Sequence, residues 1–183
     1  MLKALLARQI GKMERQWGYD ASYMRRVLSA STSTFLKFGV LAGLVDRKAA
    51  PGGAIAAAGI VGTLIEDCGP CTQIGVDMAA ADGVSPVILR AILVGDEAAM
   101  GVDAALAWRF ARASLARDMA TCDPLRDEIV RRWGEKGLLA VSMAITTARM
   151  YPTLKYALGH GKACSKVLVA GVAAPVAHLL IAA

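Results

Sequence analysis

The chain has 183 residues, enough to bury one sizeable core and few for two, so a single domain over residues 1–183 is expected. Hydrophobic residues make up 56% of it and aromatic residues only 5%, and the abundance of alanine, leucine and valine suits closely packed helices. The formal net charge of +6 lies wholly before Ala50, in a region with neither aromatic–basic interleaving nor a glycine-rich phosphate loop, which argues against a nucleic-acid partner.

Residues 1–48 are expected to form a basic, helical N-terminal arm. Its first helix is amphipathic, because apolar residues recur at three-and-four spacing opposite basic ones as far as Gly18, which ends the helix. The arm is predicted to hold helices over 2–17, over 21–30, and from within 31–34 to Val45.

Residues 50–160 are expected to form the core of an all-α, multi-helix bundle, because no strand-type alternation persists anywhere in the chain. The segment 54–65 is expected to lie deepest, since its many alanines and glycines let neighbouring backbones approach closely. Ser85 and Asp123 each precede a proline and are expected to cap new helices. Core helices are predicted over 54–65, from Pro70 to Ala81, from Pro86, around 103–119, from Pro124, and over 138–150.

The C-terminal extension, 161–183, is compatible with an irregular segment, a short strand or a packing helix, and no order is assigned beyond Pro152. The uncharged stretches 49–65 and 167–183 are slightly shorter than the about 20 residues that a spanning helix needs, so buried helices and no membrane partner are expected. Charges throughout the first helix are unlike the apolar core of a secretory signal. The four cysteines do not form a secreted-type framework, which favours a cytoplasmic protein.

The sequence EDCGPCT at 66–72 places Cys68 and Cys71 at the start of the helix predicted from Pro70. The partial positive charge of a helix N-terminus stabilises a thiolate, and by position Cys68 is expected to have the lower pKa. The two-residue spacer brings both sulfurs within bonding distance, so a disulfide can form and break there. Two small buried hydrophobic residues remain the alternative interpretation of this pair.

The other two cysteines, Cys122 and Cys164, are single and distant from this pair, and a buried core role is expected for both. No second paired motif or histidine stands at zinc-ligand spacing, so neither a metal nor a cofactor is expected. His160 is interpreted as an exposed loop histidine. Arg149, Tyr151 and Tyr156 are interpreted first as packing or interface residues.

The segments LIEDCGPCTQIGVDMAAADGVSP and RRWGEKGLLAVSMAITTARMYPTLKYALG resemble the alkyl hydroperoxidase D-like and carboxymuconolactone decarboxylase-like family, over roughly residues 50 to 160. A CxxC that opens a helix, followed by Gly-Val-Ser-Pro before the next helix, carries the resemblance. It implies an all-α bundle that assembles into homo-oligomers, often trimers or hexamers, and that reduces peroxides through a cysteine pair. The decarboxylase members lack this pair, which disfavours their chemistry here.

The peroxidase members of that family have a proton relay of one glutamate and two histidines. At the corresponding positions this sequence has Ala56, Pro70 and Gly75, so the resemblance supplies the dithiol without its base. Glu66 is the best remaining candidate for moving the proton, because a carboxylate in a partly apolar pocket can exchange protons with a sulfur. Asp67 is expected to cap the helix.

We therefore expect a thiol–disulfide oxidoreductase, similar to alkyl hydroperoxide reductases, with Cys68, Cys71 and Glu66 as its catalytic residues. Its substrate would be a peroxide or a disulfide-bearing partner, and its electron donor is not indicated by the sequence. Which cysteine attacks first stays open. The alternative is a non-enzymatic oligomeric binding or stress-related module in which the same cysteines are structural.

Overall fold

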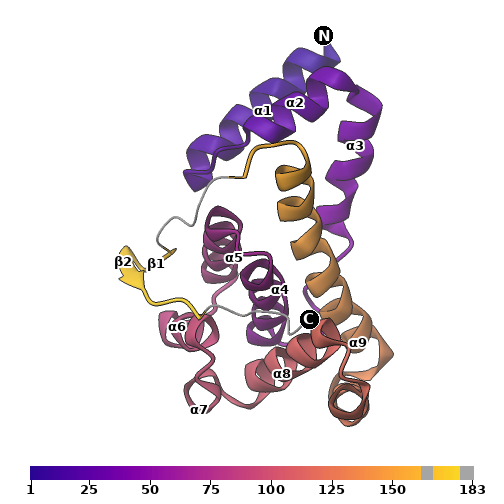
Figure 1. The fold of residues 1–183 in the computed structure, drawn as a ribbon, viewed down its shortest axis with the longest axis vertical. Helices are drawn as coiled ribbons and strands as arrows, with labels where there is room; N and C mark the ends of the chain where they lie inside the picture. Colours follow the sequence, from indigo (N-terminus) through magenta and orange to yellow (C-terminus); the bar gives the residue numbers. More distant parts are fainter. Residues whose placement is uncertain (162–166, 178–183) are drawn as a thin grey trace.

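The computed structural model describes residues 1–161 and 167–177. This part of the chain is mostly helical with two short strands, so the predicted all-α class is confirmed apart from a small hairpin near the C-terminus (Figure 1). The helices are α1 Leu2–Trp17, α2 Ser22–Ala30, α3 Thr32–Val40, α4 Gly52–Ile65, α5 Gly69–Ala81, α6 Pro86–Val94, α7 Glu97–Met100, α8 Val102–Ala116 and α9 Met119–Ala157.

Helix α4 is the centre of the core, as predicted for 54–65, and it packs against α5, α6, α8 and α9. Its small residues explain the close approach to α9. A Cβ atom added at Gly62 would lie 3.1 Å from the carbonyl oxygen of Ile145 and 3.2 Å from Cβ of Ala148. A larger residue at Gly62 would therefore force the two helices apart.

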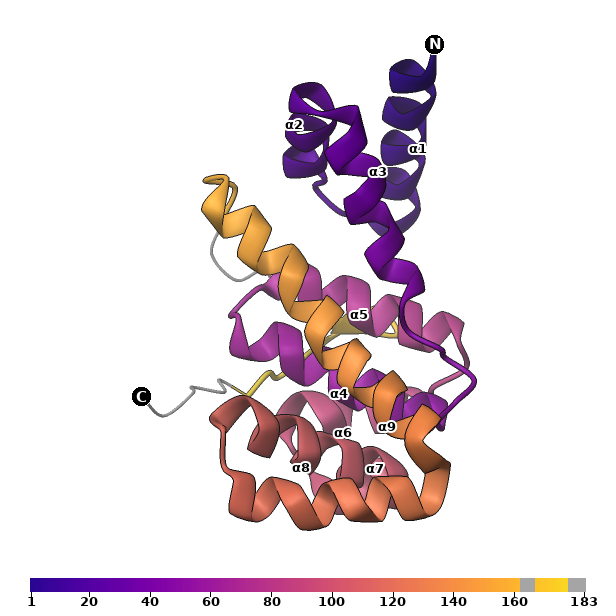
Figure 2. The same ribbon diagram turned by 90° about the vertical axis from the view of Figure 1, so that its right-hand side faces the viewer.

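The N-terminal arm, α1 to α3, forms a second and smaller hydrophobic cluster around Tyr19, Tyr23 and Leu28. It stands at one end of the body, where the C-terminal part of α9 rises to meet it (Figure 2). Gly18 ends α1 in the left-handed conformation (φ 58°), as predicted. Helix α3 ends at Val40, earlier than predicted, and continues as a 3-10 turn over Leu41–Gly43.

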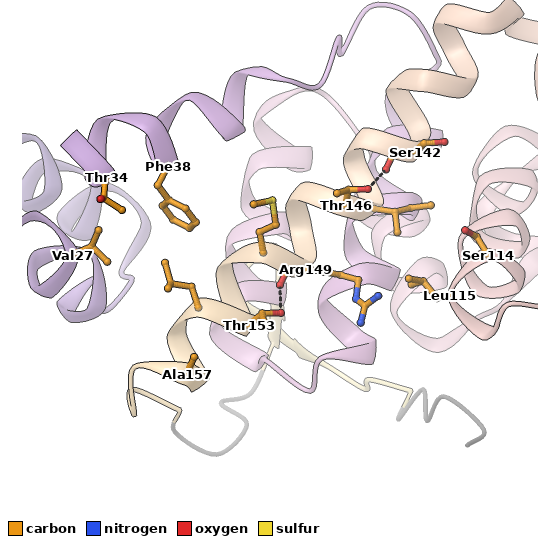
Figure 3. A pocket seen from close by; sticks show the side chains of 13 residues that line it. Val27, Thr34, Phe38, Ser114, Leu115, Ser142, Thr146, Arg149, Thr153 and Ala157 are labelled. Atoms are coloured by element: carbon orange, nitrogen blue, oxygen red, sulfur yellow. Dashed lines mark hydrogen bonds between the residues drawn. The ribbon is translucent and has the colours of Figure 1, made fainter. Parts of the chain in front are cut away.

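A cavity of about 690 Å³ separates the arm from the body (Figure 3). Val27 and Phe38 line its arm side, and α8 and α9 line the other, with Leu115 and Arg149 among the contributors. No cysteine is among its lining residues, so this cavity does not open onto the dithiol.

The predicted helix start at Asp123 and Pro124 is wrong. Helix α9 begins at Met119, and its N-cap is Asp118, whose carboxylate accepts a hydrogen bond from the Thr121 amide (3.1 Å). Pro124 lies inside the helix that follows this cap. The helical geometry breaks instead at Gly134 (φ 68°), where α9 is kinked.

Helix α9 also continues through Pro152 to Ala157, where the sequence assigned no order. Beyond it, the strand alternative for the extension is confirmed, because β1 (Val167–Val169) pairs antiparallel with β2 (Val172–Ala174). Residues 178–183 and Cys164 lie outside the described residues, so the expectations for them are untested.

Candidate redox site

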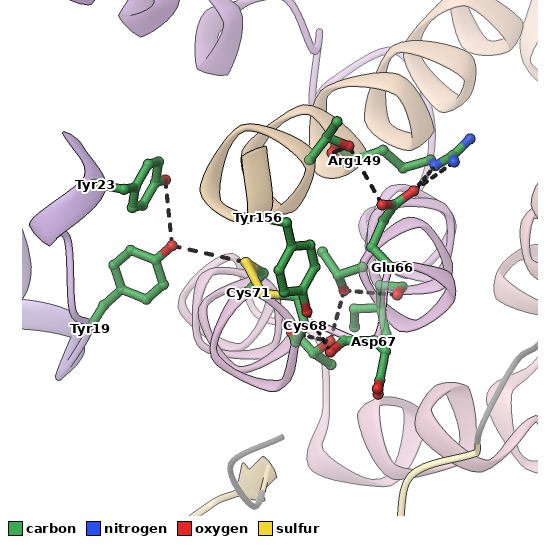
Figure 4. Close-up of a disulfide and its surroundings, with 12 residues drawn as sticks. Tyr19, Tyr23, Glu66, Asp67, Cys68, Cys71, Arg149 and Tyr156 are labelled. Carbon is green, nitrogen blue, oxygen red and sulfur yellow. Dashed lines mark hydrogen bonds and ion pairs between the residues drawn. A yellow bond between two sulfur atoms is a disulfide. The ribbon is translucent and has the colours of Figure 1, made fainter. Parts of the chain in front are cut away.

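Cys68 and Cys71 form a disulfide at the N-terminus of α5, with their Cα atoms 5.2 Å apart (Figure 4). Cys68 is the N-cap residue and Cys71 lies in the first turn, as the sequence predicted. No side chain caps this helix end, so its amides are free of a competing carboxylate or hydroxyl cap. The partial positive charge of the helix terminus is therefore available to a thiolate.

A buried network of hydroxyl groups holds the corner between α4 and α5 that carries Cys68. The Thr72 hydroxyl lies 3.1 Å from the carbonyl oxygen of Cys68 and 3.0 Å from the Thr63 hydroxyl, which donates to the carbonyl of Ile60 (2.9 Å). The Cys68 amide donates to the Thr63 carbonyl (3.3 Å). The backbone of Cys68 is thus fixed from both helices.

Asp67 forms the turn of this corner and does not cap the helix, which corrects the expectation for it. Its backbone is left-handed (φ 48°), a conformation that aspartate tolerates better than most residues. Its carbonyl oxygen accepts a hydrogen bond from the Tyr156 hydroxyl (2.8 Å), which ties the corner to the last turn of α9. Tyr156 therefore contacts the corner that carries the disulfide.

Both sulfurs are covered, since Cys68 is 2% exposed and Cys71 is 4% exposed. On the Cys68 side the cover is the C-terminal segment. A cavity of about 10 Å³ remains between Cys68 and residues Val167, Val176 and Ala177. That volume is at the lower limit for one water molecule, so a reactant reaches Cys68 only if this cover moves.

The cover is held by hydrogen bonds to α5, which carries the dithiol, and to α6. The side-chain Nε2 of Gln73 donates to the backbone carbonyl of Leu168 (3.1 Å), and the side-chain Oε1 of Gln73 accepts from the backbone amide of Leu168 (2.6 Å). A neighbouring strand would make the same pair of hydrogen bonds. Arg90 donates to the carbonyl of Val169 (3.1 Å), and the backbone amide of Ala177 donates to the carbonyl of Leu93 (2.8 Å). These contacts hold the hairpin over Cys68.

On the Cys71 side the cover is the N-terminal arm. The hydroxyl of Tyr19 lies 3.9 Å from Sγ of Cys71 and donates to the hydroxyl of Tyr23, 3.4 Å away. The two rings meet edge to face, and the ammonium group of Lys155 lies 5.5 Å from the centre of the Tyr19 ring. Burial raises the pKa of Tyr19 and the pKa of Tyr23 above the ordinary phenol value, so both hydroxyls keep their protons at neutral pH.

The sequence interpretation did not find Tyr19 or Tyr23. They lie about fifty positions before the CxxC, in a different element, and only the packing of the arm brings them to Cys71. The available signal was weak: two tyrosines four residues apart, directly after the end of the amphipathic first helix.

Glu66, the predicted proton carrier, is engaged elsewhere. One carboxylate oxygen accepts from Arg149 (2.6 Å) and the other lies 3.5 Å from the Thr153 hydroxyl. Figure 4 shows the carboxylate directed to Arg149 rather than to the sulfurs. The structure therefore brings together Cys68 and Cys71, and Glu66 would have to leave its ion pair to serve them.

The other residues noted in the sequence have ordinary contacts. The ring of Tyr151 packs edge to face on Phe38 (5.0 Å), and Nδ1 of His160 lies 3.0 Å from the Ser22 hydroxyl. Cys122 is buried in the main core, as predicted.

The described residues contain no group of three or more His, Cys, Asp or Glu side chains that could hold a metal ion. Within 1–161 and 167–177, no helix combines the length and apolar character needed to cross a bilayer. Comparison with protein-family models, with curated proteins and with solved structures finds no match.

Proposed function

We propose that this chain is a thiol–disulfide oxidoreductase that reduces a peroxide, or a partner's disulfide, by cycling Cys68 and Cys71 between dithiol and disulfide. The observation that carries the proposal is the disulfide at the uncapped N-terminus of α5. A helix start favours the thiolate, and a bond between residues three apart opens and closes with little backbone movement.

In the peroxide reaction one thiolate attacks the O–O bond and becomes a sulfenic acid, while the departing alkoxide takes up a proton as an alcohol. The second thiol then attacks the sulfenic sulfur, which releases water and forms the Cys68–Cys71 disulfide. Two external thiols regenerate the dithiol and leave as their own disulfide. The net transfer is two electrons from the thiols to the peroxide.

The covered sulfurs favour a small oxidant over a protein disulfide, since Cys68 and Cys71 are 2% and 4% exposed. The resemblance to the alkyl hydroperoxidase D-like family is part of this proposal, as are the homo-oligomer and a cytoplasmic setting where thiols regenerate the dithiol. Support for that family remains the CxxC at a helix start and the Ser85–Pro86 start of α6.

The alternative is that the disulfide is structural, in a non-enzymatic oligomeric binding or stress-related module. The burial of Cys68 and Cys71 favours this structural role, and so does the hydroxyl network of Thr63 and Thr72 that fixes the backbone of Cys68. An inert disulfide in a rigid corner would have these features.

Peptide mapping by mass spectrometry distinguishes a redox-active pair of cysteines from a structural one. Reduced wild type treated with stoichiometric peroxide should lose two hydrogen atoms, localised to the peptide with Cys68 and Cys71, and a dithiol should restore them. Cys122→Ser is the matched control and should behave as wild type. If the native disulfide resists reduction by a dithiol, or the reduced pair stays reduced while a reference dithiol oxidises, and Cys68→Ser and Cys71→Ser melt at lower temperature, the cysteines are structural.

The proposed role of Glu66 has its own test. Glu66→Gln and Arg149→Gln both break the same ion pair, but only the first removes the carboxylate. If Glu66 moves the proton, Glu66→Gln slows oxidation by peroxide and Arg149→Gln does not. Equal rates in the two variants would assign Glu66 a purely structural role. Stopped-flow measurement of thiol loss gives the rates.

A further inference from the structure

The two sulfurs of the disulfide have different surroundings, and the difference gives them different roles. Cys68 is among the residues that line the water-sized cavity under the C-terminal hairpin, whereas Sγ of Cys71 lies 3.9 Å from the hydroxyl of Tyr19 in the N-terminal arm. A thiol that attacks a disulfide approaches one sulfur and expels the other as a thiolate. The expelled sulfur leaves more readily where a hydrogen-bond donor meets the developing negative charge.

Tyr19 is placed to be that donor. A disulfide sulfur carries no proton, so the hydroxyl is the only possible donor in its contact with Cys71 at 3.9 Å. Rotation about the C–O bond turns the proton from Tyr23 toward the sulfur, and the Tyr23 hydroxyl can then donate to the Tyr19 oxygen 3.4 Å away. Tyr23 is fully buried and Tyr19 is 6% exposed, so water does not compete for these bonds.

We propose that Tyr19 is a catalytic residue that donates a hydrogen bond to Cys71 as the disulfide opens, with Tyr23 as its positioning residue. The inference rests on the proposed redox cycle and assigns the order of its reductive half. The incoming thiolate attacks Sγ of Cys68, the S–S bond breaks, and Cys71 leaves with the electron pair as a thiolate. A second thiolate then attacks the external sulfur of the mixed disulfide and releases Cys68, which takes a proton from water.

Tyr19 keeps its own proton throughout this sequence. Burial raises its pKa, so a phenol that is a weaker acid than a thiol supplies a hydrogen bond and no proton. The effect of the bond is to stabilise the charged form of Cys71, which lowers the pKa of that thiol. Tyr19 thus stabilises the thiolate of Cys71, as the helix N-terminus stabilises the thiolate of Cys68.

The test measures the pKa of Cys71 in the reduced Cys68→Ser background, from the pH dependence of iodoacetamide alkylation followed on the Cys71 peptide by mass spectrometry. Tyr19→Phe should raise this pKa by about one to two units, the usual effect of losing one hydrogen bond to a charged group. Tyr23→Phe should shift it in the same direction by less. The control is Tyr151→Phe, a nearby tyrosine whose ring packs on Phe38 and which should cause no shift.

A second readout uses the otherwise unaltered chain: reduction of the disulfide by dithiothreitol should be several-fold slower in Tyr19→Phe than in Tyr151→Phe. Meta-fluorotyrosine at position 19 keeps the shape of the side chain and makes the phenol a stronger hydrogen-bond donor, so it should lower the pKa of Cys71. This variant tests the role of Tyr19 if Tyr19→Phe does not fold. If neither substitution at Tyr19 moves the pKa while the disulfide still cycles with peroxide, this inference fails and the proposed function stands. A chain that never cycles would overturn the proposed function instead.

Discussion

Cys122 shows how burial can outweigh a neighbouring positive charge in setting the pKa of a thiol. It is 2% exposed in the main core, and burial raises the pKa of its thiol although the guanidinium of Arg126, 3.7 Å from Sγ, acts in the opposite direction. Less thiolate forms at a given pH, and reagents cannot reach the sulfur.

We predict that native Cys122 resists alkylation at pH 8 for hours and reacts fully once the chain is unfolded by guanidinium chloride. Quantitative mass spectrometry of the Cys122 peptide checks this, with free glutathione alkylated in the same tube as the reference. Rapid native labelling would mean that the core around α9 opens readily, contrary to its burial.

The residues that carry the site divide by how far their contacts reach along the chain. Cys68 and Cys71 could be placed from the sequence, because a CxxC beside a proline defines its own helix start within a few residues. Tyr19 could not, because its contact with Cys71 spans 52 positions and depends on how the arm packs. The pairing of Glu66 with Arg149, 83 positions away, was hidden for the same reason.

At the scale of elements, the helices were found more reliably than their ends. Gly18 and Ser85 fix their ends by local geometry and were predicted correctly. Near the start of α9 the sequence predicted Asp123, before Pro124, as the cap, and Asp118 has the same cap chemistry. The structure uses Asp118, which leaves only Arg117 and Asp118 between α8 and α9.

The pairing of α1 with α2 makes the arm sensitive to acid. Arg25 of α2 donates hydrogen bonds to the carboxylate of Glu14 in α1, and these lower the pKa of Glu14 below its ordinary value of 4.5. A group with a lowered pKa stabilises the fold above its unfolded pKa and loses that contribution as the pH falls through the folded value.

We therefore predict that wild type melts at a higher temperature than Glu14→Gln at pH 7, and that the difference shrinks as the pH falls below 4.5 and through the lowered pKa of Glu14. Thermal melts followed by circular dichroism across this range measure it. Glu97→Gln, which loses another exposed ion pair, with Arg109, in the body, is the control for general loss of surface charge. A difference that persists in acid would show that Glu14 acts through packing rather than charge.

At the scale of the whole molecule, the arm has apolar side chains that nothing in the described chain covers. Leu2, Leu5, Leu36 and Val40 are between 44% and 63% exposed, all on α1 and α3. Apolar surface of this kind is typical of a contact between subunits. We therefore predict that the arm is part of the contact between subunits in the proposed homo-oligomer.

We predict that sedimentation equilibrium at micromolar concentration gives a species larger than the 19.1 kDa chain, and that the double variant Leu36→Glu, Val40→Glu shifts it toward monomer. Leu139→Glu places a single negative charge on an exposed leucine of α9, 62% exposed, and should leave the assembly unchanged. Wild type that sediments as a clean monomer would remove the prediction.

The fastening of the hairpin by Gln73 has a kinetic consequence. If a covered sulfur reacts only after its cover lifts, the reaction is gated, and the oxidant cannot accelerate it beyond the rate of opening. The observed rate of dithiol oxidation should then rise with peroxide concentration and reach a plateau. Gln73→Ala removes both hydrogen bonds to Leu168 and should raise the plateau, while the initial slope rises with the larger open population.

Gln73→Glu is the intermediate variant, because it keeps the acceptor for the Leu168 amide and loses the donor to the Leu168 carbonyl. Its plateau rate should fall between those of wild type and Gln73→Ala. Stopped-flow oxidation over a wide range of peroxide concentrations makes the measurement. A strictly linear dependence in wild type would mean that the cover opens faster than the chemistry. With a plateau, the rate of dithiol oxidation at high peroxide concentration is set by the opening of the cover, and the two hydrogen bonds between Gln73 and Leu168 are among the contacts that this opening breaks.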